Sequence, residues 1–281
     1  MKFTKMQGLG NDYVYVSCLE SIPENAEKLA VKISDRHFGV GSDGLILICS
    51  SDIADFKMVM YNADGSVSEM CGNGIRCVGK YVRDKGLTDK DEISVETGAG
   101  IKYLKFHREN GETKLITVDM GAPILNGLDI PTVFDKNPVV AEPIEVDGVT
   151  YKTTCVSMGN PHSVVFLDKD TDLKAFDIDG IGSKFESHPA FPRRVNAEFA
   201  KVIKPGLLEM RVYERGTGET LACGTGTCAT HVAARLNGLT GDRSVVRLLG
   251  GELIIEWNGE GSVKMTGPAE FVFEGEYKWP E

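Results

Sequence analysis

The chain has 281 residues, of which 42% are hydrophobic and 26% charged, a composition typical of a globular protein with one large or two smaller domains. Acidic residues outnumber basic ones by 41 to 31, for a net charge of −10, which disfavours nucleic acid and anionic membranes as partners. The longest apolar runs are too short to span a bilayer. The seven cysteines, in a chain whose start lacks the apolar stretch of a secretory signal, predict reduced thiols and a cytoplasmic location.

The first half of the chain predicts several strands around one principal helix. Ile75, Val78 and Val82 recur at the spacing of one helix face. We therefore expect a helix over Ile75–Lys85, with Gly86 as its C-terminal glycine. Alternating or β-branched residues predict strands at Tyr13–Cys18, Leu45–Cys49, Phe56–Tyr61, Glu92–Glu96, Lys102–His107 and Lys114–Met120.

The second half of the chain has the same predicted plan. A helix is expected over Thr227–Asn237, followed by Gly238. Strands are expected at Ser163–Leu167, Ala200–Ile203, Leu208–Tyr213, Val245–Leu249 and Glu252–Trp257. Both halves therefore indicate an α+β arrangement in which a mostly antiparallel sheet packs on one principal helix.

An internal repeat relates the two halves. Residues 70–74 read Met-Cys-Gly-Asn-Gly and residues 222–226 read Ala-Cys-Gly-Thr-Gly, an offset of 152 residues. Further upstream, Gly10-Asn11 matches Gly159-Asn160 at an offset of 149, so a net insertion of three residues separates the two landmarks. We predict two similar domains related by pseudo-two-fold symmetry, at 1–121 and 122–267, with segment 268–281 as a candidate strand of the first.

Two cysteines, Cys71 and Cys223, stand at the turn that opens each principal helix. Unpaired backbone N–H groups and the positive helix end favour an anion there, which predicts a lowered thiol pKa. The same amides suit a substrate carboxylate. If pseudo-symmetry brings the two thiols to one cleft, one thiolate can remove a proton from a carbon centre while the other thiol returns one on the opposite face. The pattern predicts a two-base racemase or epimerase.

The remaining cysteines have a simpler interpretation as small buried side chains: Cys18, Cys49, Cys77, Cys155 and Cys228. No metal is predicted, because Cys71 and Cys77 miss the ligand spacing of zinc sites and no histidine pair completes one. Residues 39–44 fit G-x-G-x-x-G but lead into a strand rather than a helix. They therefore give no support to a nucleotide or nicotinamide cofactor.

A series of motifs runs in a fixed order along nearly the whole chain. These are Lys-Met-Gln-Gly-Leu-Gly-Asn-Asp at 5–12, Tyr-Asn-Ala-Asp-Gly-Ser at 61–66, Met-Cys-Gly-Asn-Gly-Ile-Arg-Cys at 70–77, Gly-Asn-Pro-His at 159–162, Arg-Val-Asn at 194–196, Tyr-Glu-Arg-Gly at 213–216, Ala-Cys-Gly-Thr-Gly at 222–226 and Thr-Gly-Pro-Ala at 266–269. The series resembles the diaminopimelate epimerase family. The resemblance implies a cofactor-independent isomerase that interconverts LL- and meso-2,6-diaminoheptanedioate on the route to lysine and peptidoglycan, commonly as a homodimer.

The resemblance also implies roles for particular residues. Cys71 and Cys223 correspond to the base and acid pair, and His162 and Glu214 to groups that tune them. The corresponding substrate-binding residues are Asn11, Asn62, Gly72, Asn73, Asn160, Asn196, Glu214, Arg215, Gly224 and Thr225. Such a set suits a substrate that is zwitterionic at both ends. In one departure, Gly44 follows Asp43 where some family members have a substrate-contacting glutamine.

Each residue has an alternative when it is read alone. Asn11 and Asn160 are also suited to turns beside glycine, His162 to the core, and Glu214-Arg215 to an exposed ion pair. Two other functions also remain open. One is a related two-cysteine racemase of proline, hydroxyproline or histidine, and the other is a non-catalytic thiol switch of the same fold.

Overall fold

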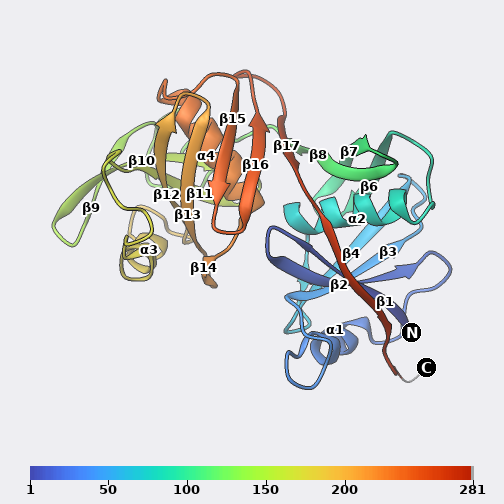
Figure 1. Ribbon diagram of the computed structural model, residues 1–281. Helices are drawn as coiled ribbons and strands as arrows, with labels where there is room; N and C mark the ends of the chain where they lie inside the picture. Colours follow the sequence, from blue (N-terminus) through green and yellow to red (C-terminus); the bar gives the residue numbers. More distant parts are fainter. Residues whose placement is uncertain (280–281) are drawn as a thin grey trace. The chain divides into compact units, whose positions relative to one another are not determined.

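The computed structural model describes residues 1–279, and this part of the chain divides into two compact units. One unit comprises Met1–Asp119 together with the segment from Thr266 onward, and the other comprises Met120–Met265 (Figure 1). None of the helices in the described residues is long and apolar enough to cross a membrane.

The first unit surrounds helix α2 with strands. Its helices are α1 (Ala26–Ser34) and α2 (Gly72–Asp84). Its strands are β1 (Lys2–Gly8), β2 (Asn11–Cys18), β3 (Gly44–Cys49), β4 (Phe56–Asn62), β5 (Val67–Ser68), β6 (Glu92–Thr97), β7 (Gly100–Glu109), most of β8 (Glu112–Gly121) and β18 (Glu270–Glu276).

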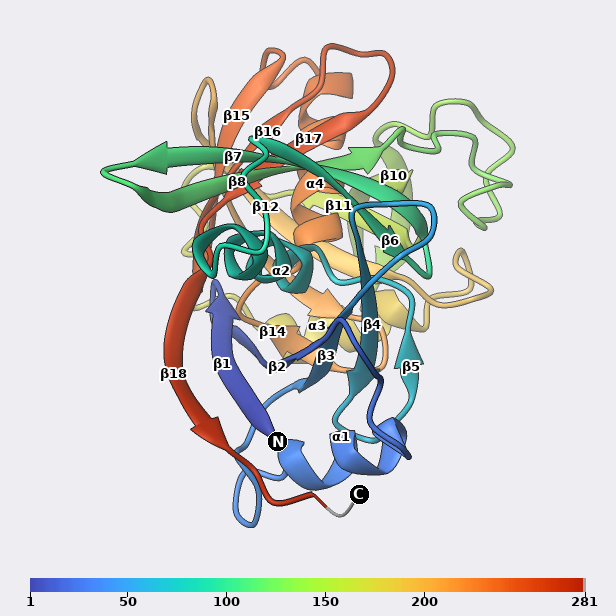
Figure 2. The same ribbon diagram turned by 90° about the vertical axis from the view of Figure 1, so that its right-hand side faces the viewer.

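Most strand pairs of the first unit are antiparallel. From β18 the sheet runs through β1, β2, β3, β4, β6, β7 and β8, and only β2–β3 and β4–β6 are parallel. Figure 2 shows β18, from the C-terminal end of the chain, beside β1 from its start. Residues Leu9 and Gly10, both with positive φ, form the tight turn between β1 and β2, where glycine is readily accommodated.

The second unit has the same construction around helix α4. Its helices are α3 (Ile178–Glu186) and α4 (Gly224–Leu236). Its strands are β9 (Glu142–Val146), β10 (Val149–Ser157), β11 (Pro161–Phe166), β12 (Asn196–Lys204), β13 (Leu207–Glu214), β14 (Gly218–Thr220), β15 (Arg243–Leu248), β16 (Gly251–Glu256) and most of β17 (Val263–Gly267).

The strand pairing repeats from one unit to the other. In the second unit the order is β9, β10, β11, β12, β13, β15 and β16, with parallel pairs only at β11–β12 and β13–β15. The register agrees as well, since Tyr13 pairs with Gly44 and His162 pairs with Asn196. The predicted α+β fold with two similar domains is therefore confirmed.

The two principal helices are largely buried within their units. Ten of the 13 residues are buried in α2 and ten of 13 in α4. Gly79 lets α2 approach β7 closely, since a Cβ there would stand 2.8 Å from Leu104 Cδ2. Both helices end as predicted, with Gly86 and Gly238 at φ of 72° and 70°.

Helices α1 and α3 are absent from the sequence-based expectation. Each has only nine residues, and α1 begins after Asn25, whose side chain makes no capping hydrogen bond. Helix α1 begins at Ala26 and helix α3 begins at Ile178, an offset of 152 positions between the repeats. In the strands that precede them, the equivalent residues Tyr13 and His162 are offset by only 149 positions. The three-residue insertion therefore lies in the connection between β11 and α3.

Candidate active site

Each principal helix begins immediately after a cysteine. Cys71 and Cys223 are the N-cap residues of α2 and α4, with φ of −128° and −112°. Their sulfur atoms accept hydrogen bonds from the backbone N–H groups of Gly74 and Gly226, at 3.3 and 3.4 Å. Both thiols thus take the place that a capping oxygen has in other helices. The predicted position of the two cysteines at the helix starts is confirmed.

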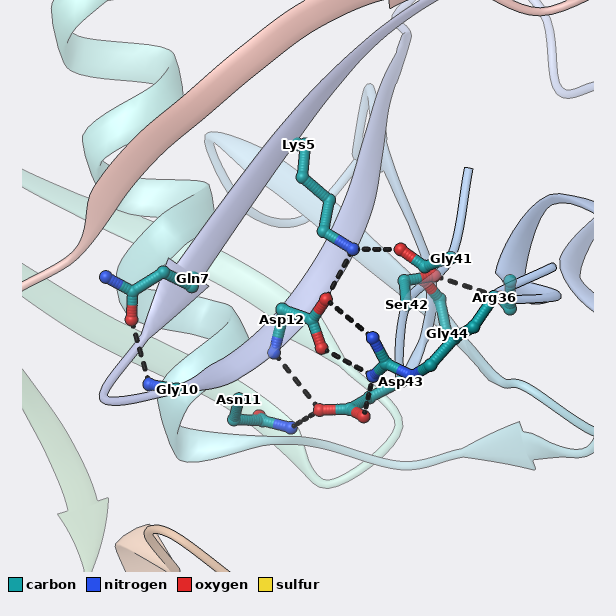
Figure 3. Close-up of polar contacts among 11 residues, drawn as sticks. Lys5, Gln7, Gly10, Asn11, Asp12, Arg36, Gly41, Ser42, Asp43 and Gly44 are labelled. Carbon is teal, nitrogen blue, oxygen red and sulfur yellow. Dashed lines mark hydrogen bonds and ion pairs between the residues drawn. The ribbon is translucent and has the colours of Figure 1, made fainter. Parts of the chain in front are cut away.

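Asn11 links the first thiol to a carboxylate. Cys71 Sγ donates to Asn11 Oδ1 at 3.2 Å. On its other side, Asn11 Nδ2 donates to Asp43 Oδ2 at 2.7 Å (Figure 3). An amide oxygen accepts and an amide nitrogen donates, so Asp43 determines which end of the Asn11 side chain faces the thiol. Asn11 therefore orients the Cys71 S–H group, and it is more than a turn residue.

Asp43 belongs to a cluster of charges beside the β1–β2 turn. Its Oδ2 also accepts from the backbone N–H of Asp12 at 3.1 Å, and its Oδ1 is 2.9 Å from Arg36 Nη2. Asp12 in turn pairs with Arg36 and with Lys5, which also donates to the Gly41 carbonyl (Figure 3). Burial opposes ionisation of Asp12, but Arg36 and Lys5 outweigh it and hold its pKa below the usual range.

The remaining predicted residues of the first unit lie on the same elements. Gly72 and Asn73 form the first turn of α2, and Asn73 Oδ1 accepts from the buried Arg76 at 2.9 Å. Arg76 also donates to the carbonyls of Gly72 and Pro268, at 3.0 and 3.1 Å. Asn62 ends β4, and its Nδ2 donates to Ser66 Oγ at 2.9 Å.

The thiol of Cys223 differs from the expectation for a helix start. Burial, followed by the nearby carboxyl groups of Glu214 and Glu198, raises the pKa of Cys223 well above its ordinary value. Only 6% of its surface is exposed. The prediction of a lowered pKa is wrong for Cys223, because loss of water and two acidic neighbours outweigh the Gly226 amide and the Thr225 hydroxyl, which lies 3.5 Å from the sulfur.

A buried chain of polar groups lies beneath the start of α4. His162 on β11 has no exposed surface, and its Nδ1 is 2.6 Å from Glu198 Oε1. Its Nε2 is 3.0 Å from Asn160 Oδ1. Burial raises the pKa of Glu198, although the contact with His162 acts in the opposite direction. His162 therefore connects a buried carboxyl group to one of the predicted substrate-binding amides.

Asn196 and Arg215 are held together at the ends of their strands. Asn196 Nδ2 donates to the Pro161 carbonyl at 2.9 Å, and its Oδ1 accepts from the Arg215 backbone N–H at the same distance. The Arg215 side chain donates to the Arg193 carbonyl at 3.1 Å. Glu214 ends β13 and accepts from the Thr220 hydroxyl.

In each unit the structure places some of the predicted residues beside the cysteine. Asn11 contacts Cys71, and Gly72 and Asn73 follow that thiol on α2. In the second unit, Gly224 and Thr225 follow Cys223 on α4 and Glu214 raises its pKa, whereas His162 contacts Asn160. The Asn62 side chain, at the end of β4, instead donates to Ser66.

Asp43 and Glu198 are the two residues of these networks that sequence reasoning did not select. Asp43 stands in the glycine-rich segment 39–44, which carries no local signal for a contact with Asn11. Glu198 offered a usable signal, because it is an acidic residue inside the strand Asn196–Lys204 among apolar neighbours, and unpaired acidic side chains are rarely buried.

Gly44 has no room for a larger side chain. A Cβ at this position would stand 2.1 Å from the Tyr61 carbonyl oxygen and 2.8 Å from Tyr13 Cε1. The glutamine that some relatives have at this position would therefore require the backbone of β3 or β4 to shift.

The other five cysteines are all buried, as expected for packing residues: Cys18, Cys49, Cys77, Cys155 and Cys228. Burial raises the pKa of Cys77 to about 11 and that of Cys155 to about 12. These thiols are unsuited to proton transfer near neutral pH. In residues 1–279 no group of three or more histidine, cysteine or acidic side chains is placed to hold a metal ion.

Two repeated α+β units, each with a cysteine capping its principal helix, define a class of two-cysteine isomerases. The family model for diaminopimelate epimerase matches residues 3–125 and 154–272. The diaminopimelate epimerase of Acetivibrio thermocellus is 58% identical to this chain and the alignment covers 98% of both. That of Methanococcus maripaludis is 54% identical, over 98% of this chain and 99% of the relative. This chain belongs to the diaminopimelate epimerase family, and the resemblance predicted from its motifs is confirmed.

The fold extends beyond that family. A solved structure of a probable proline racemase from Agrobacterium radiobacter aligns with a TM-score of 0.68 over 99% of this chain and 93% of its own. Its sequence identity is only 14%, so the likeness concerns the fold and not the substrate.

Proposed function

We propose that this protein interconverts LL- and meso-2,6-diaminoheptanedioate by proton transfer between the substrate α-carbon and two thiols, Cys71 and Cys223. One cysteine, as thiolate, removes the α-proton, and the other, as thiol, gives a proton to the opposite face of the same carbon. After the reaction, the cysteine that began as a thiolate is a thiol, and the other cysteine is a thiolate. It serves the synthesis of lysine and peptidoglycan precursors and requires no cofactor.

The observation that carries this proposal is the capping of each principal helix by a cysteine, in a chain at least 54% identical to two diaminopimelate epimerases over nearly their full length. Backbone N–H groups at a helix start favour an anion. The N–H groups at the starts of α2 and α4 are therefore suited to stabilise the negative charge that develops on the carboxylate beside the carbanion.

The remaining residues are assigned to substrate recognition and thiol tuning. Asn11, supported by Asp43, would meet the substrate beside Cys71. Arg215 and Glu214 carry charges that match the carboxylate and ammonium groups of the substrate. We assign His162 and Glu214 to the tuning of the thiols. The other binding residues are Asn62, Gly72, Asn73, Asn160, Asn196, Gly224 and Thr225.

The proposed organisation follows from the repeat. Domain 1–121, completed by segment 268–281, supplies Cys71, and domain 122–267 supplies Cys223. We further propose that the protein acts in the cytoplasm as a homodimer. Size-exclusion chromatography with light scattering would test the dimer, since a monomer that is fully active at micromolar concentration contradicts it.

Exchange of the α-proton provides the direct test. In deuterated water, the protein should incorporate deuterium into LL-diaminopimelate and give the meso isomer, followed by mass spectrometry and chiral chromatography. Proline, hydroxyproline and histidine should not exchange. Exchange of one of these instead would identify a related racemase, and no exchange with any of them would favour the thiol switch.

Replacement of single cysteines tests the two roles. Cys71→Ala and Cys223→Ala should each lower the turnover number by at least about 100-fold, because each variant lacks one proton-transfer group. Cys49→Ala, which removes a buried thiol of β3, is the matched control and should retain activity. Substantial activity in both single variants would contradict the two-thiol reaction.

A further inference from the structure

Two residues occupy the same position beneath the two catalytic turns. In the parallel pair β2–β3, Ile46 lies two residues beyond Gly44, and in β11–β12, Glu198 lies two residues beyond Asn196. A Cβ added to Gly74 would stand 2.7 Å from Ile46 Cδ1. A Cβ added to Gly226 would stand 2.6 Å from Glu198 Oε1 and 3.4 Å from Cys223 Sγ. The repeat therefore places an apolar side chain under one thiol and a carboxyl group under the other.

The repeated fold does not itself require an acid at this position. Ile46 is fully buried and fills the site in the first unit. Glu198 is equally buried, which is costly for a carboxyl group, and its Oε2 has no hydrogen-bond partner in residues 1–279. A group with this cost, absent from the equivalent position of the repeat, points to chemistry rather than packing.

The two contacts of the His162 ring restrict where the protons shared with Asn160 and Glu198 can lie. His162 Nε2 faces Asn160 Oδ1, an acceptor, and so carries a hydrogen. The short contact between His162 Nδ1 and Glu198 Oε1 then holds one further proton, on either the nitrogen or the oxygen. In both forms a carboxyl oxygen of Glu198, with full or partial negative charge, stays fixed beneath the Cys223 turn.

The titratable groups around this position come from several elements. His162 on β11, Glu214 on β13 and Cys223 at the start of α4 influence Glu198, and Cys155 on β10 is influenced by it. Glu198 and Glu214 both disfavour a thiolate at Cys223. Ile46, at the equivalent position under Cys71, carries no charge.

We propose that Glu198 is a positioning residue that keeps Cys223 as the protonated member of the thiol pair in the substrate-free protein, which leaves Cys71 as the thiol that ionises first. A two-thiol reaction needs one thiolate and one thiol. If the surroundings of Cys71 and Cys223 were identical, neither cysteine would be favoured as the thiolate. Glu198 contributes to the difference between their surroundings alongside burial and Glu214. This inference rests on the proposed function only for the statement that both thiols exchange protons with a substrate.

The pH dependence of alkylation measures the inference without turnover. Substrate-free protein is treated briefly with iodoacetamide across a range of pH, and modification of Cys71 and Cys223 is counted separately by peptide mass spectrometry. The thiolate is the reactive form, so the midpoint of each curve reports ionisation even where burial slows the reaction. In the protein without substitutions, the alkylation midpoint of Cys223 should lie at a higher pH than that of Cys71. The reverse order would overturn the proposal.

Two substitutions identify Glu198 as the cause. Glu198→Gln keeps the shape and can still bond to His162, and Glu198→Ile reproduces the residue of the first unit. Each should move the Cys223 midpoint down by about one pH unit, so that its alkylation below the midpoint becomes about tenfold faster. Ile46→Val is the control and should move neither midpoint.

The outcomes separate this inference from the proposed function. An unchanged Cys223 midpoint in folded Glu198→Gln and Glu198→Ile proteins would leave Glu198 a structural residue and refute the inference. If the protein without substitutions were inactive toward diaminopimelate, the proposed function would be refuted, but the alkylation midpoints of the two cysteines would not change. Melting temperatures of the variants establish that folded proteins are compared.

Discussion

Replacement of Asp43 by asparagine tests whether the network of Figure 3 supports the first thiol. Asp43 acts on Cys71 through Asn11, since Asp43 Oδ2 accepts a hydrogen bond from Asn11 Nδ2 at 2.7 Å and Asn11 Oδ1 faces the thiol. In Asp43→Asn the side chain can still accept from Asn11, but it loses its charge and offers an N–H group to the guanidinium of Arg36. The Asn11 amide is then held less firmly in its orientation toward the Cys71 S–H group.

The magnitude follows from the bonds that lose their charge. Two donors, Asn11 Nδ2 and the Asp12 backbone N–H, bond to Asp43 Oδ2 at 2.7 and 3.1 Å. A hydrogen bond to a charged group exceeds a neutral one by about 1 kcal/mol. The Asp43 side chain is 38% exposed, and solvent reduces this to about 1–2 kcal/mol for both bonds. If this energy is lost from the transition state, turnover falls by about tenfold.

The assay compares Asp43→Asn with Asp12→Asn in steady-state epimerisation and thermal unfolding. Asp12 pairs with the same Arg36, but Asn11 does not bond to its side chain. Asp12→Asn should therefore lower the melting temperature with little loss of turnover number. Asp43→Asn should lower the turnover number more than it raises KM. Equal turnover in the two variants, or an unchanged turnover number in Asp43→Asn, would refute the reasoning.

Two further predictions concern a packing contact and a buried histidine. Gly226→Ala should lower turnover by about tenfold or more, because its Cβ would stand 2.6 Å from Glu198 Oε1 and overpacking costs about 1–3 kcal/mol. Gly241→Ala is the control, since position 241 has open space around it. Full activity of Gly226→Ala would contradict the contact with Glu198. Burial lowers the pKa of His231 to about 4 from its ordinary 6.5, so the unfolded chain binds the extra proton first as the pH falls. Stability should be complete above pH 6.5 and decline by about 3 kcal/mol between pH 6.5 and 4. Urea unfolding across this range should show a smaller decline in His231→Gln, and an equal decline would assign the effect to other groups.

The elements with strong local signals could be predicted from the sequence. Helix α2 follows from the spacing of Ile75, Val78 and Val82, and its end follows from Gly86. Helices α1 and α3 could not be predicted, because nine-residue helices are stable only through the core on which they pack. Leu29 and Ile33 of α1, for example, are fully buried against the sheet of their unit.

The site divides in a similar way. Cys71 and Cys223 could be identified because repetition, neighbouring glycines and a helix start coincide at each of them. Asp43 could not, since it reaches Asn11 across 32 positions of the chain. Glu198 could not be connected to His162, because that contact depends on the parallel pairing of β11 and β12.

By itself, the sequence determined that one α+β unit is used twice, that each copy places a cysteine before its principal helix, and which family the chain belongs to. These properties depend on local spacing and on short motifs, which are fully present in the chain as a string of residues. Only the tertiary structure decided how the two thiols differ. The ionisation of Cys223 depends on lost water and on the carboxyl groups of Glu198 and Glu214, which reach it only when β12 and β13 pack beneath α4. For that thiol, burial outweighs the helix start, which is the reverse of what its local sequence predicted.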